Sequence, residues 1–374
     1  MIPEGTANTP KTGAPLARHP PINKGVLRGS RIAWEMIRSG VTPLRNSDPK
    51  AAWALERPAL GLSLGGTHGA DQARRQRRWI ALAESLELHS AWLPEMHFQS
   101  GVCPAPLVEL AGYAASTRHL RLGTTSLLLP LHPPEEIAAE IASLDQLCEG
   151  RLLIGLGRGF QKPMLEAFDV APAEKRNRFD EALDRILALW AEHNARADSG
   201  PLQTHQRPHP PLAVAAFGPK GLAQAARRNL PYLASPVETF DQIAGNQDLH
   251  RSLLPDPRKA ALSLVMRTVF VSENPDERAQ ARATLATEMT GGRAGMPKAV
   301  TEALDAPLEE RVVIGSPAQV QARLIRERQR LGIDLLISRP QISGLETDVL
   351  ERSLCLLARE VWPAVIAAPP EASA

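Results

Sequence analysis

Eight short apolar runs are spread along the chain between residues 59 and 340. A strand that is buried on both faces, as in a parallel sheet, reads as a continuous apolar run because neither face meets water. We therefore predict eight β-strands in this part of the chain. They cover residues 59–64, 90–94, 120–129, 151–157, 210–217, 230–236, 264–272 and 333–340.

Stretches with helical spacing of apolar residues lie between these runs. After the first run, for example, Trp79, Ile80, Ala83 and Leu86 recur on one face of a helix. Helices are predicted at residues 73–88, 106–117, 135–148, 173–192 and 345–365. Repeated strand–helix units predict an α/β fold, a closed TIM (β/α)₈ barrel, with a doubly wound open sheet as the alternative. In a barrel, functional residues are expected at the carboxyl ends of the strands.

The N-terminal segment, residues 1–57, shows no sustained period and is rich in Pro and Arg. It holds nine Lys/Arg against four Asp/Glu, a net charge of +5, whereas the whole chain carries +2. We interpret it as a basic, largely irregular arm with one helix near residues 30–40, ahead of a barrel domain at 58–374. A disordered tail and an arm that packs on the barrel or on a partner subunit both stay open. In the second case, Trp34 and Trp53 are the expected anchors.

Composition narrows the class of protein. With 374 residues, 43% of them hydrophobic, the chain can bury the core of one large domain or two ordinary ones. The net charge of +2 gives no indication of nucleic-acid binding. Its three cysteines are scattered without a CxxC pair, so neither a disulfide framework nor a metal site is expected. The sequence has no signal-peptide h-region and no apolar stretch long enough to span a bilayer, which predicts a cytoplasmic protein without a membrane partner.

Polar residues end the second run abruptly. The stretch "SAWLPEMHF" (90–98) finishes in Glu95, Met96 and His97, which the predicted barrel places at the functional end of a strand. A carboxylate and an imidazole can transfer protons, whereas a thioether cannot. The simpler explanation is a paired or solvated charge at the barrel mouth.

Two glycine-rich stretches are candidate anion sites. In "GLGRGF" (155–160), Arg158 lies between two glycines at a strand end, and a guanidinium suits bidentate binding of phosphate. In "AFGPKG" (216–221), Gly218 precedes a predicted helix whose free N–H groups can hold an anion, with Lys220 adding charge. The alternatives are a tight turn that needs glycine and an ordinary helix start after Pro219. The first stretch is not a dinucleotide-binding fingerprint, because no helix follows it directly.

Seven motifs follow one another along the chain. They are "AWLPEMHF" (91–98), "ASTRHLRLGTTSLLLPLHPP" (115–134), "EEIAAEIASLDQLCEGRLLIGLGRGF" (135–160), "RFDEALDRILALW" (178–190), "RPHPPLAVAAFGPKGLAQAARRNLPYLASP" (207–236), "VVIGSPAQVQARLIRERQRLGIDLLISRPQ" (312–341) and "LLAREVWPAV" (356–365). The ordered set resembles the bacterial-luciferase-like flavin-dependent monooxygenases. No single motif is specific, but the set is, and it spans most of residues 59–365.

The resemblance implies a TIM barrel that binds reduced FMN or, in a sister branch, the deazaflavin F420. It implies a monooxygenase in which reduced FMN and O₂ form a C4a-(hydro)peroxyflavin that oxygenates a small organic substrate. A separate flavin reductase and a homodimer, formed through the helices after strands two and three, are the implied partners. F420-dependent hydride transfer and a flavin- or partner-binding member without turnover are the alternatives.

Individual residues take roles from the family by position. Met96 stands where the family has a proton-transferring His, and His97 matches a second, more structural His. The strand at 123–126 is expected to carry a bulge, with Thr125–Ser126 matching a non-prolyl cis peptide on which the flavin ring rests. The implied catalytic residues are His97 and Glu95, the implied cofactor-binding residues are Thr124, Thr125, Ser126, Arg158, Phe217, Gly218, Lys220 and Gly221, and the implied substrate-pocket residues are Met96, Phe98, Phe160 and Met164.

Two further motif residues are expected to be structural. His132 is expected to anchor a loop, and Asp145 to pair with Arg151. Substrate selection is assigned to loops that carry no readable motif, at residues 161–173, 193–208 and 290–311.

Overall fold

The computed structural model describes residues 49–65, 70–98, 103–196, 200–256, 262–288, 296 and 298–369. All of them belong to one compact unit, Asn46–Ala374. The predicted arm up to residue 48, with its helix near 30–40 and Trp34, lies outside the described residues.

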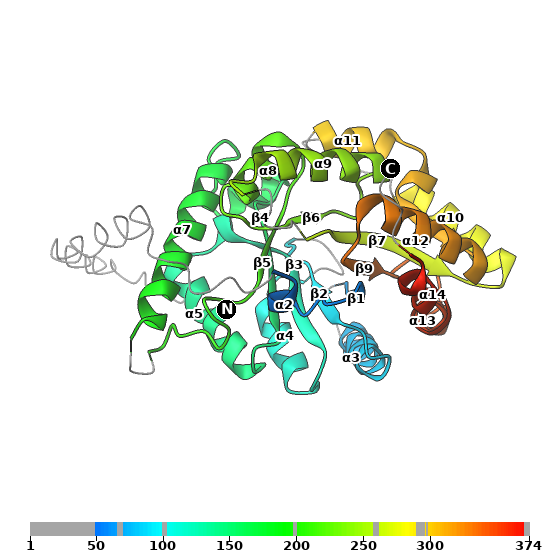
Figure 1. The fold of residues 1–374 in the computed structure, drawn as a ribbon, viewed down its shortest axis with the longest axis horizontal. Helices are drawn as coiled ribbons and strands as arrows, with labels where there is room; N and C mark the ends of the chain where they lie inside the picture. The colour runs from blue at the N-terminus through cyan, green and yellow to red at the C-terminus, as the bar shows by residue number, and fades with distance from the viewer. Residues whose placement is uncertain are drawn as a thin grey trace, which may run out of the picture. The chain divides into compact units, whose positions relative to one another are not determined.

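Eight parallel strands close into a barrel at the centre of the fold (Figure 1). Going round the ring, each strand pairs with the next, and the last pairs with the first. The strands are β1 (Ala59–Ser63), β2 (Ser90–Leu93), β3 (Arg121–Leu128), β4 (Leu152–Gly157), β5 (Leu212–Ala215), β6 (Tyr232–Ala234), β7 (Leu264–Val271) and β9 (Leu335–Arg339). They fall within the eight predicted runs, so the TIM barrel is confirmed and the open sheet is wrong.

A ninth strand, β8 (Val312–Gly315), was not predicted. It pairs with the last four residues of β7, Thr268–Val271, whereas the first five residues of β7 pair with β9 inside the ring. Because β7 is longer than its ring neighbour, its end is left free to bind β8 outside the closed barrel. Four residues are too short an apolar run to stand out in the sequence.

Helices surround the ring (Figure 1). The helices predicted at 73–88, 106–117, 135–148 and 173–192 are α3 (Ala70–Ser85), α4 (Pro106–Ala114), α5 (Pro134–Leu147) and α7 (Lys175–Asn194). The helix expected at 345–365 is α13 (Thr347–Leu356) and α14 (Trp362–Ala367), joined by a π-helical turn. The structure also has helices for which no range was predicted: α2 (Pro49–Trp53), α6 (Lys162–Ala167), α8 (Pro219–Ala226), α9 (Phe240–Leu253), α10 (Pro275–Glu288), α11 (Lys298–Asp305) and α12 (Pro317–Leu331).

The inside of the barrel has its own apolar cluster, separate from the larger one between strands and helices. Within it, Trp53 of α2 stacks on Trp92 of β2, with ring centroids 6.3 Å apart. The Trp53 carbonyl accepts a hydrogen bond of 2.9 Å from His89, which precedes β2. This end of the predicted arm therefore fills the amino-terminal end of the barrel, as expected if Trp53 is an anchor. The carboxyl ends of the strands are left for a site.

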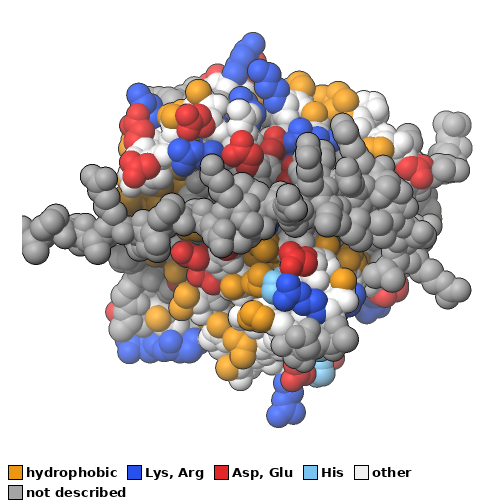
Figure 2. All heavy atoms as spheres, turned by 90° about the vertical axis from the view of Figure 1, so that its left-hand side faces the viewer, with side chains coloured by type: hydrophobic (Ala, Val, Ile, Leu, Met, Phe, Trp, Pro, Cys, Tyr) orange, Lys and Arg blue, Asp and Glu red, His pale blue; other side chains and the backbone are white. Residues whose placement is uncertain are grey.

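The described surface carries charges of both signs. On the face in Figure 2, Lys/Arg and Asp/Glu side chains are interspersed, and no field of one sign dominates. Among the described residues, no helix combines the length and the hydrophobicity that crossing a membrane requires.

Candidate functional site

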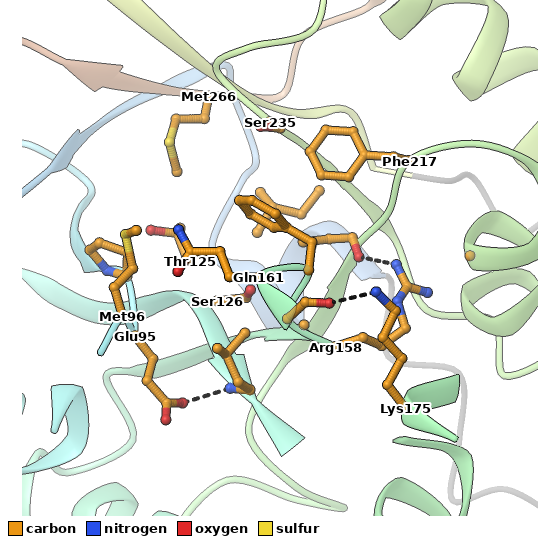
Figure 3. Close-up of a pocket in the computed structure, with 18 of the residues that line it drawn as sticks. Glu95, Met96, Thr125, Ser126, Arg158, Gln161, Lys175, Phe217, Ser235 and Met266 are labelled. Carbon is orange, nitrogen blue, oxygen red and sulfur yellow. Dashed lines mark hydrogen bonds between the residues drawn. The ribbon is translucent and has the colours of Figure 1, made fainter. Parts of the chain in front are cut away.

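A cavity of about 250 Å³ opens at the carboxyl ends of the strands, lined by β3 to β7, the segments after β2 and β4, and the first residues of α7 (Figure 3). Nine of the residues singled out in the sequence line it: Glu95, Met96, Thr125, Ser126, Arg158, Phe160, Met164, Phe217 and Gly221. The structure thus brings together segments that lie far apart in the sequence. His97, Phe98, Thr124, Gly218 and Lys220 are not part of the lining.

The bulge expected in β3 is present. The pairing of β3 with β4 shifts register between Thr125 and Leu127, and the Thr125–Ser126 peptide bond is cis. A Cβ atom at Gly155 would collide with the Thr124 carbonyl, and one at Gly157 would collide with the Ser126 hydroxyl. These two glycines therefore give the bulge its room, whereas Gly159, just after the strand, has the positive φ (+68°) that the suggested turn requires.

The two threonines of the bulge differ in what their hydroxyls do. Thr124 donates a hydrogen bond of 2.8 Å to the Gly155 carbonyl, so this side chain fastens the bulge to β4. The Thr125 hydroxyl is buried and has no hydrogen-bond partner among the described residues. Since a buried hydroxyl without a partner is costly, Thr125 is placed to bond a ligand in the cavity that it lines.

Positive charge is concentrated on the other side of the cavity, at Arg158, Lys175 and Arg176. Arg158 donates to the Ala215 carbonyl and to Gln224 Oε1, both at 2.7 Å, and Lys175 donates to the Gly159 carbonyl at 3.1 Å (Figure 3). Burial, reinforced by Arg176, lowers the pKa of Arg158 to about 10, which still leaves it charged at neutral pH. Burial and the two arginines also lower the pKa of Lys175. An anion bound here would relieve this repulsion.

The neighbouring acid does not neutralise this cluster. Asp180 pairs with the exposed Arg227 and the largely buried Arg228, and it accepts from Gln224. These contacts outweigh its burial and lower its pKa. Three cations therefore face the cavity with their compensating acid engaged elsewhere.

Lys175 and Arg176 were missed in the sequence, which showed only an amphipathic helix there. A signal was available, because the first turn of α7 contains three cations, Lys175, Arg176 and Arg178, and no acid. The helix dipole disfavours cations at that end. A functional requirement for positive charge explains the exception.

The start of α8 contributes less than predicted. Gly218 adopts φ +76° and precedes the helix, and Lys220 is exposed, outside the cavity. Gly221 has a specific role, since a Cβ atom there would lie 2.7 Å from Arg158 Nη1. Its lack of a side chain lets the guanidinium lie against the beginning of the helix.

Glu95 is a buried network residue. Oε1 accepts from His97 Nε2 at 2.8 Å and from His132 Nε2 at 2.9 Å, and Oε2 accepts from the Leu128 amide at 2.7 Å. Burial alone would raise the pKa of Glu95, but these hydrogen bonds outweigh it and lower the pKa. The pKa of His132 is raised, because the carboxylate outweighs its burial. In Figure 3 the Glu95 carboxylate points away from the cavity, so it ties together the segments after β2 and β3.

The remaining predicted residues lie to the side. The ring of His97 packs edge-on against Phe168 at 4.7 Å between centroids, and the side chain of Phe98 is 72% exposed. Asp145 accepts from the backbone and side chain of Gln206, both at 2.8 Å. Arg151 donates instead to Thr117 and two carbonyls, so the predicted Asp145–Arg151 pair is wrong. In the described part of the chain, no group of three or more His, Cys, Asp or Glu could hold a metal ion.

Comparisons with known proteins agree with this architecture. The family model described as luciferase-like monooxygenase matches residues 59–335. The oxygenase component of flavin-dependent trigonelline monooxygenase from Acinetobacter baylyi is 28% identical over 213 residues, 52% of this chain and 58% of that protein. The chain thus spans little more than half the length of this relative, and 51% of another curated relative.

Solved structures match over a larger share of the chain. Monooxygenase RslO1 from Streptomyces bottropensis has a TM-score of 0.70 and 25% identity, with 82% of this chain and 99% of that one covered. The oxygenating constituent of 3,6-diketocamphane monooxygenase from Pseudomonas putida, in complex with FMN, has a TM-score of 0.66 and 19% identity, with 82% and 98% covered. Together with the family match over residues 59–335, the barrel and its bulged third strand identify the chain as an enzyme of the luciferase-like monooxygenase family.

Proposed function

We propose that this enzyme binds reduced FMN in the cavity and uses it with O₂ to oxygenate a small organic substrate. The observation that carries the proposal is the polarity of the cavity. Arg158 and Lys175 lie on one side, and the Thr125–Ser126 bulge lies on the other. Arg176, next to Lys175 in sequence, also lines the cavity and acts electrostatically on both cations. FMN has matching ends, a phosphate dianion and a flat ring with a polar edge.

The basic side fits a phosphate monoester. Each terminal nitrogen of Arg158 donates one hydrogen bond, Nη1 to Gln224 and Nη2 to the Ala215 carbonyl, and these two bonds fix the plane of the guanidinium. Its remaining donors, together with Lys175 and Arg176, suit a dianion, because charge-assisted hydrogen bonds are strongest where the cations are held in place. Gly221 leaves room for the Arg158 guanidinium, because a Cβ atom there would collide with it.

The opposite side fits a flat ring. Leu128, Leu233 and Met266 give apolar walls, and the Thr125 hydroxyl is free to bond a ring heteroatom. Bound reduced FMN would supply the electrons that activate O₂. The protein's part is to position the ring, to keep water out with these walls, and to offer hydroxyl hydrogens at Thr125 and Ser126.

Proton transfer by the corner after β2 is not part of the proposal. Met96 lines the cavity and cannot carry a proton, while Glu95 and His97 bond each other beside it. We assign Glu95 and His97 the role of positioning Met96 and the bulge. The relative from Acinetobacter baylyi is named as an oxygenase component, which supports a separate flavin reductase as the partner here.

A homodimer is part of the proposal. Its interface would be formed by α4 and α5, which follow β2 and β3. Val108 of α4 is 74% exposed and Leu147 of α5 is 67% exposed, which is unusual for large apolar side chains. Sedimentation equilibrium of the wild-type protein and of a Val108→Asp variant tests this, with a shift to monomer expected for the variant.

A titration of the purified protein with FMN, riboflavin and F420 tests the cofactor. FMN should bind at least about 100-fold more tightly than riboflavin, since riboflavin lacks the phosphate that three cations would hold. Tighter binding of F420 than of FMN would replace the proposal with hydride transfer. If added reduced FMN is oxidised with H₂O₂ as the sole product for every substrate tried, a binding protein without turnover becomes the better account.

A further inference from the structure

Arg339, the last residue of β9, lies on the inner face of the barrel. Side chains alternate along a strand, and Leu335 and Ile337 both belong to the cluster inside the barrel. Arg339 is two residues further on and therefore also faces inward, nearer the carboxyl end. It pairs in register with Thr268, as Ile337 pairs with Met266, which lines the cavity.

Arg339 lies across the ring from the basic side of the cavity. In the closed order of eight strands, β9 is the fourth neighbour of β4 in either direction. Arg158 follows the end of β4. A ligand that enters the carboxyl-terminal end of the barrel, beside a cofactor bound near Arg158, would therefore contact the end of β9.

The guanidinium of Arg339 has little to compensate its charge. Nη1 donates a long hydrogen bond, 3.4 Å, to the Thr268 hydroxyl, and the guanidinium forms no ion pair with any described Asp or Glu. Burial lowers its pKa, opposed by Glu288, whose carboxylate accepts from the Ser343 amide.

Arg267, on the neighbouring strand, has different surroundings. It is fully buried, faces outward and donates to two backbone carbonyls beside the Glu238 carboxylate. Arg339 is half-buried and has no such partners, so its partial desolvation is offset best by an anion that binds from outside. The need for a planar, bidentate partner points to a carboxylate.

We infer that Arg339 binds the carboxylate of the substrate, so that the enzyme acts on small organic acids. One cation suits a monoanion, whereas the three on the β4 side suit a phosphate dianion. Arg339 itself is not among the residues that line the cavity, but Met266, Met96 and Phe160 line it and would contact the apolar body of the acid. The inference rests on the proposed function, because it takes the β4 side to be occupied by the cofactor.

Binding of acids and their neutral amides tests this inference. The probes are benzoate, phenylacetate and octanoate, each paired with its primary amide, titrated by calorimetry into the protein with and without FMN. We expect at least one acid to bind about tenfold or more tightly than its amide. Arg339→Met should abolish that preference and leave FMN affinity within about twofold, and Arg339→Lys should retain part of it.

Arg121→Met is the matched control. Arg121 is also half-buried with its pKa lowered by burial, but it starts β3 at the other end of the barrel and donates to Gly150 at 3.5 Å. Its variant should keep the acid preference. The inference is overturned if no acid is preferred over its amide, if Arg339→Met keeps the preference, or if Arg121→Met loses it equally.

A loss of FMN affinity in Arg339→Met would also overturn the inference, because it would place Arg339 in the cofactor site. Failure of the cofactor proposal has a different signature. The wild-type protein would then not bind FMN, while the preference for acids, measured without FMN, would still report on Arg339. If Arg339→Met does not fold by circular dichroism, Arg339→Lys decides the question through the same ratio of acid to amide.

Discussion

Arg158, which is half-buried at the cavity, and Arg267, which is fully buried, have opposite electrostatic surroundings. Burial lowers the pKa of each to about 10. Around Arg267, the residues Glu238, Tyr232 and Glu327 oppose that lowering of the pKa. The guanidinium carbon of Arg267 also lies 4.3 Å from the centroid of the Phe240 ring. Around Arg158, the second cause of the shift is another cation, Arg176.

The difference indicates a structural role for Arg267 and a ligand-binding role for Arg158. Arg267 has its compensation inside the protein, on the outer side of the sheet. Arg158 lies beside two other cations in a cavity, so a bound anion would offset the repulsion among the three charges and stabilise the protein. The comparison predicts that replacing the first costs folding stability, and that replacing the second costs binding.

The largest effect is expected for Arg267→Met, with a loss of about 3–5 kcal/mol in the free energy of unfolding, because Glu238 is left buried without its cation. Urea unfolding at pH 8 measures it. Arg185→Met, which breaks only an exposed pair with Glu135, should cost less than about 1 kcal/mol. Equal losses in both variants would remove the distinction.

For Arg158→Met we expect FMN affinity to fall about 100-fold, with unfolding stability unchanged or increased, since two repelling cations remain instead of three. Fluorescence titration with FMN and urea unfolding without it measure the two quantities. A large loss of stability with unchanged FMN affinity would make Arg158 another structural arginine.

Burial of Glu238 makes the free energy of unfolding depend on pH. Its pKa is raised to about 7 from 4.5, mainly by burial, so the folded state binds more protons than the unfolded state between those values. Stability should therefore fall, on the order of 1–3 kcal/mol, as pH rises from about 4.5 to 7, and stay level above. Glu238→Gln should flatten this slope in urea unfolding; a slope of opposite sign in the wild type contradicts the assignment.

Gly157→Ala tests the bulge on which the flavin ring is proposed to rest. The added methyl would collide with the Ser126 hydroxyl, so we expect a loss of about 1–3 kcal/mol and weaker FMN binding. Gly112→Ala is the control, because a Cβ atom there meets nothing within 4 Å on helix α4. It should stabilise the protein by about 0.5–1 kcal/mol and leave FMN binding unchanged.

The smallest effect is expected for Met96→His. Because the Met96 thioether carries no titratable proton, we expect the variant to add an inflection near pH 6.5 to the rate of oxidation of reduced FMN, with a rate change below about tenfold. Stopped-flow kinetics of the variant and the wild type at several pH values measure it. A variant with the same pH profile as the wild type would contradict the expectation.

The barrel could be predicted because buried parallel strands leave an unmistakable pattern. Residues 264–272 read as a strand even though Arg267 interrupts them, since their other side chains are apolar. β8 was not predicted because its four residues form a strand only by pairing with the end of β7, and that unpaired end exists only in the folded sheet. Trp53 could be predicted only as a possible anchor, because no pattern in residues 1–57 distinguishes an arm that packs on the barrel from a disordered tail.

The site was predictable where strand ends determine it. Arg158, Thr125 and Met96 follow or end strands, so the barrel brings them to one mouth. Lys175, Arg176 and Arg339 were missed because a pattern of apolar residues says which face of an element is buried, but not which charges lack a partner. That information comes from the packing of segments remote in sequence.

The central claim, that three cations hold the phosphate of FMN, is tested most directly by phosphorus NMR of bound FMN across pH. Free phosphate monoesters take up a proton with a pKa near 6. With Arg158, Lys175 and Arg176 around it, the bound phosphate should stay a dianion, its resonance unchanged down to about pH 5. A bound resonance that titrates as in free FMN would contradict the account.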